Sequence, residues 1–231
     1  MIVLWMQQIA MGVPVADEVR AIWVTRWSYQ NAADIDNALD DVRDAGANTV
    51  LFQVRGRFDA TYPSTLEPWA SHLSDPGFDP LAHAVEGAHA RKLALHAWVN
   101  VYPIWSGSKT PPASHPASKH PEWLLPNEPG ASYRFAAPGH PDVQNHIVAV
   151  LSDLDQRYDV DGIHLDYLRY PGPKVADFDG SLDPGVRRQR VVDLVVKLDE
   201  AIQAPLTAAV WGIYENRWEW APVSQGNVDY H

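Results

Sequence analysis

The chain has 231 residues, of which 46% are hydrophobic and 20% charged, a composition that suits a globular protein with a sizeable core. Its 18 basic and 29 acidic residues give a net charge of −11, which argues against nucleic acid or an anionic membrane as a partner. Cysteine is absent, so disulfide bonds and thiolate chemistry are excluded. The 10 tryptophans are interpreted partly as core packing and partly as platforms for sugar rings.

The first 16 residues are apolar, but they lack a basic start and are too short to span a bilayer. We interpret residues 1–19 as a leader or the remnant of a signal peptide, in preference to a strand-like segment. This interpretation predicts an extracellular or periplasmic protein. No other stretch is long and apolar enough for a membrane helix, so one domain is expected over residues 20–231.

Strands and helices alternate along this domain. Runs of β-branched and aromatic residues predict strands at residues 21–25, 48–54, 93–100, 163–166 and 206–211. Apolar residues at helical spacing predict helices that begin near Asn31, Asp79, Pro141 and Asp183, the first of which ends at Gly46. Such alternation implies right-handed crossovers and a parallel sheet.

Residues 101–139 interrupt the alternation. They contain eight of the 19 prolines and show no helix or strand pattern. A connection of this length is either a functional lid or a disordered insert, and its aromatic residues favour order. We expect it to cover a cleft, with the HPEW segment at residues 120–123 as its anchor.

Two architectures fit five such strands. An open doubly wound sheet suits the number, but no glycine-rich phosphate loop follows any strand. A (β/α)₈ barrel typically needs about 250 residues, but polar residues end the second, third and fourth strands, where barrels place their active sites. The patterns themselves leave this choice open.

The segment DGIHLDYLRYP, residues 161–171, is the most informative stretch. Its alternation places His164 and Asp166 on one face of a strand, with the acid at the carboxyl end. In parallel α/β folds that end usually carries the chemistry. Asp166 is therefore the first candidate for a catalytic carboxylate, and the alternative is a structural acid that pairs with an arginine or caps the next loop.

Several segments in order resemble the glycosyl hydrolase-like family ten proteins, which are related to the glycoside hydrolase domains of exopolysaccharide-processing enzymes. They are RAIWVT (20–25), NTVLFQVR (48–55), YPS (62–64), DPL (79–81), LHAWVN (95–100), HPEWL (120–124) and YDVDGIHLDYLRYP (158–171). The resemblance implies a (β/α)₈ TIM-barrel type fold that acts on or binds a carbohydrate. The family domain normally continues further, so we expect a barrel truncated after about five to six β/α units. The family also usually has a second acid where this chain has Tyr167.

Glycoside hydrolysis commonly uses two carboxyl groups on either side of the scissile bond. Asp166 is assigned as the ionised member. Glu215, just after the fifth strand, is the first choice for its partner, by analogy with other barrel glycosidases. A solvated loop glutamate is the competing interpretation, and Asp59 and Glu122 are held in reserve.

Polar and aromatic residues near the strand ends are the candidate substrate-binding groups. They are Gln53, Arg55, Asp59, Tyr62, His96, Trp98, Asn100, Tyr102, His164, Tyr167, Arg169 and Trp211. The competing interpretation is a polar network and aromatic packing inside the barrel. His96, His164 and Asp166 could form a two-histidine-one-carboxylate metal set, but no HxxxH or HExxH spacing supports it, so no metal and no cofactor is predicted.

We therefore predict a glycoside hydrolase-like protein that cleaves a polysaccharide or cell-wall glycan by carboxylate acid/base catalysis. The alternatives are a non-catalytic carbohydrate-binding barrel and a metal-dependent deacetylase or amidohydrolase. The expected partners are a carbohydrate substrate and, through exposed barrel edges, a second copy of the chain.

Overall fold

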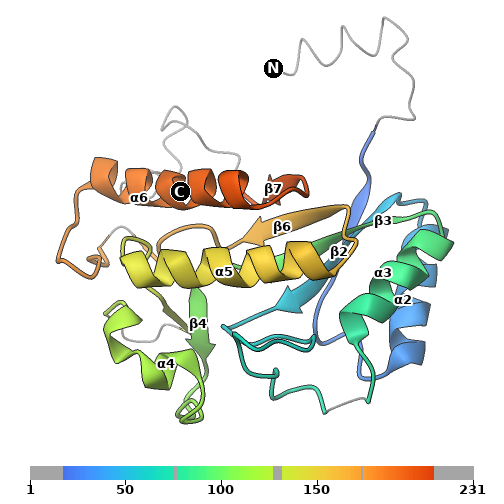
Figure 1. Ribbon diagram of the computed structural model, residues 1–231, viewed down its shortest axis with the longest axis horizontal. Helices are drawn as coiled ribbons and strands as arrows, with labels where there is room; N and C mark the ends of the chain where they lie inside the picture. Colours follow the sequence, from blue (N-terminus) through green and yellow to red (C-terminus); the bar gives the residue numbers. More distant parts are fainter. Residues whose placement is uncertain (1–17, 75–76, 127–131, 173, 211–231) are drawn as a thin grey trace, which may run out of the picture.

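The computed structural model describes residues 18–74, 77–126, 132–172 and 174–210 (Figure 1). Its centre is a five-stranded sheet in the order β1-β2-β3-β6-β7, and every neighbouring pair is parallel. The strands are β1 (Ala21–Val24), β2 (Thr49–Arg55), β3 (Ala94–Asn100), β6 (Gly162–Asp166) and β7 (Leu206–Ala208). The predicted strands are confirmed, although β7 ends at Ala208 and Trp211 lies outside the described residues.

Four long helices connect the strands. They are α2 (Ala32–Asp44), α3 (Pro80–Ala90), α5 (Pro141–Arg157) and α6 (Pro184–Ala201). The side chains of Asn31, Asp79 and Asp183 accept hydrogen bonds from the first turns of α2, α3 and α6, as their sequence positions predict. Helices α2 and α3 pack against each other, and so do α5 and α6 (Figure 1).

The core lies between the sheet and these helices. Val50, Phe52, Leu95, Ala97 and Ile163 alternate along their strands and are 0% exposed. They pack in one cluster with helix residues that include Ile35, Leu39, Ile147, Leu151 and Leu194. Burial of this apolar surface, at about 25 cal/mol per Å², is what attaches the helices to one face of the sheet.

The opposite face of the sheet carries a second set of side chains in register. Trp23, Leu51, His96 and Gly162 form one row, and Gln53, Trp98, His164 and Thr207 form the next. Asn100 and Asp166 form a third row at the carboxyl ends of β3 and β6. Rows of this kind fill the interior of (β/α)₈ barrels, so this is the barrel-facing side of the sheet.

The described residues therefore form a partial (β/α)₈ barrel, as predicted. Strands β1 and β7 are the two edges of the sheet. Trp23 on β1 is 52% exposed, a large fraction for a side chain on an interior-facing row. Self-association through these edges stays a prediction. Residues 1–17 of the predicted leader lie outside the described residues.

The expectation that residues 101–139 lack helix and strand was wrong. This segment contains β4 (Pro103–Ser106) paired antiparallel with β5 (Tyr133–Phe135), the short helix α4 (Pro116–Lys119) and the 3₁₀ turn η2 (Pro121–Trp123). Strands of three and four residues are too short to show alternation, and β4 begins with a proline, which normally argues against a strand. The order that its aromatic residues predicted is found, since Tyr102, Trp105, Trp123 and Phe135 join the core.

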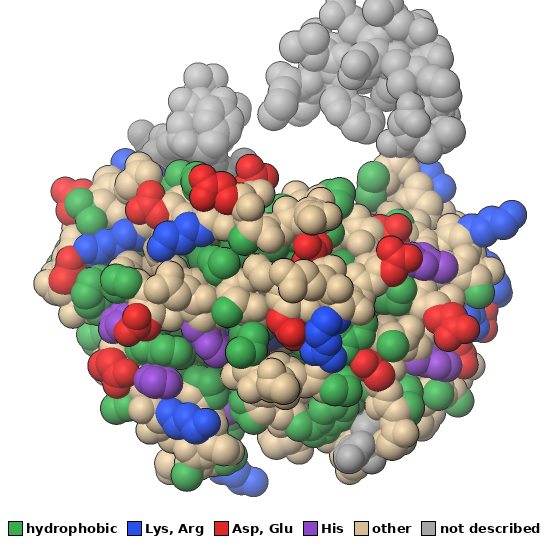
Figure 2. All heavy atoms as spheres, in the orientation of Figure 1, with side chains coloured by type: hydrophobic (Ala, Val, Ile, Leu, Met, Phe, Trp, Pro, Cys, Tyr) green, Lys and Arg blue, Asp and Glu red, His purple; other side chains and the backbone are tan. Residues whose placement is uncertain are grey.

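The face that carries α5 and α6 shows acidic, basic and histidine side chains interspersed, with no large patch of one charge (Figure 2). Among the described helices, none combines the length and apolar character needed to cross a membrane.

Candidate active site

Asp166 ends β6, on the barrel-facing side of the sheet, and is partly buried. Its Oδ2 accepts a hydrogen bond from Trp98 Nε1 at 3.2 Å, and its Oδ1 accepts one from the Tyr167 backbone N–H at 2.7 Å. Within the described parts of the chain Asp166 forms no ion pair. The carboxylate is thus oriented by two neutral donors on a partly exposed residue. The alternative of an arginine pair does not occur among the described residues, whereas the alternative of a cap on the next loop does, through the Tyr167 N–H.

Tyr167 gives the site an unusual backbone. Its φ is 52°, a conformation that non-glycine residues rarely adopt and that concentrates at functional sites. Its ring lies 5.6 Å from Tyr133 and 6.2 Å from Phe135, and the Arg169 guanidinium lies 5.2 Å from its centroid. The residue therefore connects the end of β6 to the β4–β5 hairpin.

Trp98 is a positioning residue for Asp166 in this geometry, in addition to its predicted role in stacking. Trp98→Phe keeps an aromatic ring and removes the N–H donor. Hydrogen bonds to charged groups are worth about 1.5–3 kcal/mol, so, if Asp166 is the catalytic carboxylate that the sequence predicts, we expect kcat to fall about tenfold or more with little change in KM.

The control for this substitution is Trp123→Phe. Trp123 is buried, whereas Trp98 is partly exposed, and its indole N–H has no hydrogen-bond partner among the described residues, so its loss should leave kcat within about twofold. Steady-state kinetics of both variants measures the difference. Equal rates for Trp98→Phe and the wild type would show that the hydrogen bond does not position Asp166.

His164 and His96 lie on the same face of the sheet as Asp166 and share one partner, but only His164 is in the row next to Asp166, since His96 pairs with Gly162 one row further toward the amino ends of the strands. Thr207 Oγ1 is 2.9 Å from His164 Nδ1 and 3.4 Å from His96 Nδ1. Burial lowers the pKa of His164, with Asp166 opposing the shift and His96 adding to it, and burial also lowers the pKa of His96. Both rings are therefore neutral near pH 7. His164 Nε2 is buried without a hydrogen-bond partner in the described chain, and the ring meets Trp23 edge-on at 5.8 Å.

Asn100 and Gln53 complete the polar part of this face. Asn100 is 5% exposed; its Nδ2 donates to the Gly56 carbonyl at 3.1 Å, and its Oδ1 is buried with no partner in the described residues. Gln53 Oε1 accepts the Arg26 backbone N–H at 3.1 Å. The carbonyl side of the Asn100 amide is thus an unused acceptor one strand away from Asp166.

Arg55 does not join this face. The register shifts between Gln53 and Arg55, so Arg55 pairs with Val99, whose side chain belongs to the helix-facing core. Arg55 is 1% exposed and donates to both Glu67 oxygens at 2.7 and 2.8 Å, and to two backbone carbonyls. All of these contacts are within the protein. The bulge in β2 explains why Arg55 does not share the face of Gln53, as strict alternation would predict.

Asp59 is also occupied within the protein. It is 2% exposed, and Arg26 and Arg57 bond its Oδ1 and Oδ2 at 2.9 and 3.3 Å. Glu122, on η2, is exposed and bonds His120 at 3.0 Å. Over the described ranges, neither reserve carboxylate shares a hydrogen-bond partner with Asp166.

The remaining predicted residues divide into two groups. Tyr62 and Tyr102 are at most 1% exposed, and their hydroxyls have no hydrogen-bond partner among the described residues. Glu215 and Trp211 lie outside the described residues, so the predicted partner carboxyl stays a prediction. The structure thus gathers Trp98, Asn100, His164 and Tyr167 around Asp166, leaves His96 two rows away, and directs Arg55, Asp59 and Tyr62 into internal contacts.

Three further residues at this side of the sheet escaped sequence analysis. Thr207 binds both histidines, Trp23 contacts His164, and Arg26 bonds Asp59. The parity of Thr207 and Trp23 within their predicted strands could have identified them. Arg26 follows β1, and its partner Asp59 lies 33 positions later in the sequence. No local sequence pattern predicts that pair.

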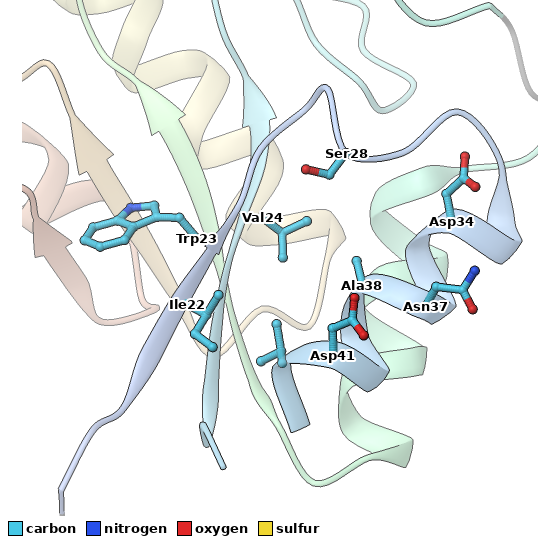
Figure 3. A pocket seen from close by; sticks show the side chains of 9 residues that line it. Ile22, Trp23, Val24, Ser28, Asp34, Asn37, Ala38 and Asp41 are labelled. Atoms are coloured by element: carbon cyan, nitrogen blue, oxygen red, sulfur yellow. The ribbon is translucent and has the colours of Figure 1, made fainter. Parts of the chain in front are cut away.

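Within the residues that the structure describes, no group of three or more histidine, aspartate or glutamate side chains could hold a metal ion. A shallow pocket of about 330 Å³ lies elsewhere, between β1 and α2, lined by residues that include Ile22, Val24, Asp34, Asn37 and Asp41 (Figure 3). Figure 3 shows Trp23 leaving β1 on the side opposite Val24. This pocket is on the helix side of the edge strand, away from Asp166, so we do not assign the chemistry to it.

A partial (β/α)₈ barrel with a carboxylate among aromatic and amide side chains at the carboxyl ends of its strands has the architecture of barrel glycoside hydrolases. The sequence profile of the glycosyl hydrolase-like 10 family matches residues 18–179, and the chain belongs to that family. The resemblance noted from the sequence is therefore confirmed. The glycosyl hydrolase YngK of Bacillus subtilis is 30% identical over 230 aligned positions, which cover 85% of this chain and 44% of YngK. The chain thus spans less than half the length of that relative.

Solved structures agree with the fold. Alpha-L-fucosidase isoenzyme 2 from Paenibacillus thiaminolyticus superposes with a TM-score of 0.63 at 17% identity, covering 87% of this chain and 34% of the fucosidase. The glycoside hydrolase domain of PgaB from Bordetella bronchiseptica superposes with a TM-score of 0.61 at 12% identity, covering 92% of this chain and 69% of that domain. At these identities the likeness establishes the (β/α)₈ barrel architecture.

Proposed function

We propose that the chain is the catalytic part of a glycoside hydrolase that cleaves a polysaccharide or cell-wall glycan. The observation that carries the proposal is the setting of Asp166: a strand-end carboxylate on the barrel-facing side, partly open to solvent and held by two neutral donors. Membership of a glycosyl hydrolase-like family supports it independently.

In this proposal Asp166 is the ionised carboxylate that stabilises or attacks the anomeric carbon as positive charge develops there. Trp98 Nε1–H and the Tyr167 N–H fix the two oxygens, so little reorganisation is needed in the transition state. The Asn100 Oδ1 acceptor is suited to a sugar hydroxyl, because a substrate O–H would satisfy a buried group that has no partner among the described residues. His164, held neutral, can accept or donate a hydrogen bond beside Asp166.

The partner carboxyl is proposed to be Glu215, by analogy with the position of the second acid in other barrels. Asp59 is a poor alternative, because two guanidinium groups already occupy its oxygens. Glu122 is equally poor, because it is exposed on η2 and paired with His120.

The test is the release of new reducing ends from a panel of neutral and acidic glycans, with mass spectrometry of the products. Cleavage products that depend on Asp166 are the expected result. Binding of glycans without any turnover would instead favour the non-catalytic carbohydrate-binding barrel. An extracellular or periplasmic site of action belongs to the same proposal, and fractionation of the producing cells tests it.

A further inference from the structure

The carboxyl ends of β1 and β2 carry a pair of arginines that share one acid. Arg26, which follows β1, donates from Nη1 to Asp59 Oδ1 at 2.9 Å. Arg57, which follows β2, donates from Nη2 to Asp59 Oδ2 at 3.3 Å and from its backbone N–H to Oδ1 at 2.7 Å. Two guanidinium charges against one carboxylate leave this cluster with one net positive charge.

Among the described residues, no neighbouring group cancels that charge. His72 and His115 bond the carbonyls of Arg26 and Arg57 at 3.0 and 2.9 Å, and burial lowers the pKa of both rings, so they are neutral near pH 7. Glu67, whose field also reaches His115, is already paired with the separate guanidinium of Arg55. The positive charge is therefore a local exception on a chain whose net charge is −11.

The same cluster contains an unused donor. Arg57 Nε is buried and makes no hydrogen bond within the described residues, while Nη1 bonds Ser106 Oγ at 3.1 Å. The Arg57 side chain retains 11% exposure and lies 4.6 Å over the Trp105 ring. Arg57 is already paired with Asp59, but a buried N–H without an acceptor still costs free energy of folding, which an added acceptor could recover.

An exposed tryptophan borders the cluster. Trp27 is 60% exposed, although its ring contacts His72 at 4.3 Å and the Arg26 guanidinium at 4.8 Å. A tryptophan fixed by two side chains but left open elsewhere is a ready platform for the apolar face of a sugar. It places a stacking surface next to the positive charge.

The cluster is linked to the Asp166 site through Gly56. Asn100, which pairs with Asp166 in the sheet, donates to the Gly56 carbonyl. The Arg26 guanidinium packs directly on the Gly56 Cα, so closely that a Cβ there would lie 1.7 Å from Arg26 Nη1. Since β1, β2, β3 and β6 are parallel, their carboxyl ends all lie at the same end of the partial barrel. One extended glycan could reach both places.

From these contacts we propose that Trp27, Arg26 and Arg57 form a subsite for an acidic sugar residue of the glycan whose bond Asp166 cleaves. Trp27 stacks on the ring, and Arg57, whose side chain is 11% exposed, contacts the anionic group, while Arg26, at 4%, contributes its charge from within the protein. The inference rests on the proposed hydrolase function and adds the charge class of the substrate. A carboxylate and a sulfate ester offer the same chemistry to the arginines.

The test is isothermal titration of the full chain carrying Asp166→Asn, so that no glycan is consumed. Oligogalacturonides are compared with their methyl esters, and sulfated galactan oligosaccharides with their desulfated forms. We expect at least one acidic form to bind about 10- to 100-fold more tightly than its neutral form, the range of a charge-assisted contact. Which pair shows the difference identifies the anionic group.

Three variants distinguish a loss of anion binding from a general disturbance of the site. Arg57→Gln should abolish the preference for the acidic form, while Asp59→Asn, which leaves both arginines, should keep or increase it and steepen its salt dependence. Trp27→Ala should weaken acidic and neutral forms alike. Equal affinity for every acidic and neutral pair, or a preference that Arg57→Gln leaves intact, overturns the subsite alone. Binding of no glycan at all overturns the proposed function as well.

Discussion

Asp166→Asn is expected to reduce glycan hydrolysis by about 10³-fold or more, the scale on which a catalytic carboxylate contributes. Asparagine has the same shape, and its Oδ1 can still accept the Tyr167 N–H. Its amide would meet the Trp98 N–H donor-to-donor, at a cost in folding of about 1 kcal/mol. Activity should therefore disappear while the fold and glycan binding persist, which initial rates, circular dichroism and titration would measure.

The control is Asp161→Asn, just before the opposite end of the same strand. Asp161 is exposed, bonds His89 at 2.9 Å and the Leu95 N–H at 2.8 Å, and lies at the amino ends of the strands, where barrels place stability contacts. It should retain full turnover. If Asp166→Asn kept a third or more of the wild-type rate, the assignment of Asp166 would be wrong whatever the family resemblance.

Most of the fold was predictable because its signals are local. Capping residues at Asn31, Asp79 and Asp183 and the alternation along β3 and β6 each act over a few residues, and the structure agrees with them. Sequence patterns left the choice between an open sheet and a barrel undecided. Closure of a sheet depends on the tilt and stagger of all its strands together, which no local pattern encodes.

The site was predictable where strand parity holds. His96, Trp98, Asn100, His164 and Asp166 share one face, as alternation along two regular strands requires. Arg55 follows a bulge, and one irregular residue is enough to exchange the two faces of a strand.

Long-range partners explain the other differences. The bidentate acceptor of Arg55 is Glu67, twelve residues later, and the acid shared by Arg26 and Arg57 is Asp59. Which arginine pairs with which acid depends on how a proline-rich loop folds back over the strand ends. These pairings are determined by how the loop packs, and the amino-acid composition of the loop does not predict them.

Glu67→Gln is expected to destabilise the protein by about 3–5 kcal/mol, because it leaves the Arg55 charge buried and unpaired. Glu67 is enclosed, with 0% of its side chain exposed; Arg55 binds both of its oxygens, and His146 Nε2 lies 3.0 Å from Oε1. Urea unfolding monitored by tryptophan fluorescence at pH 7 measures the loss. Against a total stability of roughly 5–15 kcal/mol this is a large fraction.

The control is Asp153→Asn, which removes the acid of a solvent-accessible pair. Asp153 and Arg157 are four residues apart on α5, with side chains 29% and 38% exposed, and such pairs contribute about 0.3–0.5 kcal/mol. A Glu67→Gln variant no less stable than Asp153→Asn would mean that the buried pair is replaceable by neutral hydrogen bonds.

The same pair gives a pH signature with a defined sign. Burial alone would raise the pKa of Glu67, but the Arg55 charge and hydrogen bonds from His146 and Arg55 outweigh it and lower the pKa from 4.5 to about 2. A carboxyl whose pKa is lowered on folding stabilises the protein above its unfolded pKa and loses that contribution as pH falls through the folded value. The stability difference between the wild type and Glu67→Gln should therefore shrink as the pH falls from about 4.5 to about 2. A difference that grew in this range would reverse the sign and refute the ionised state of Glu67.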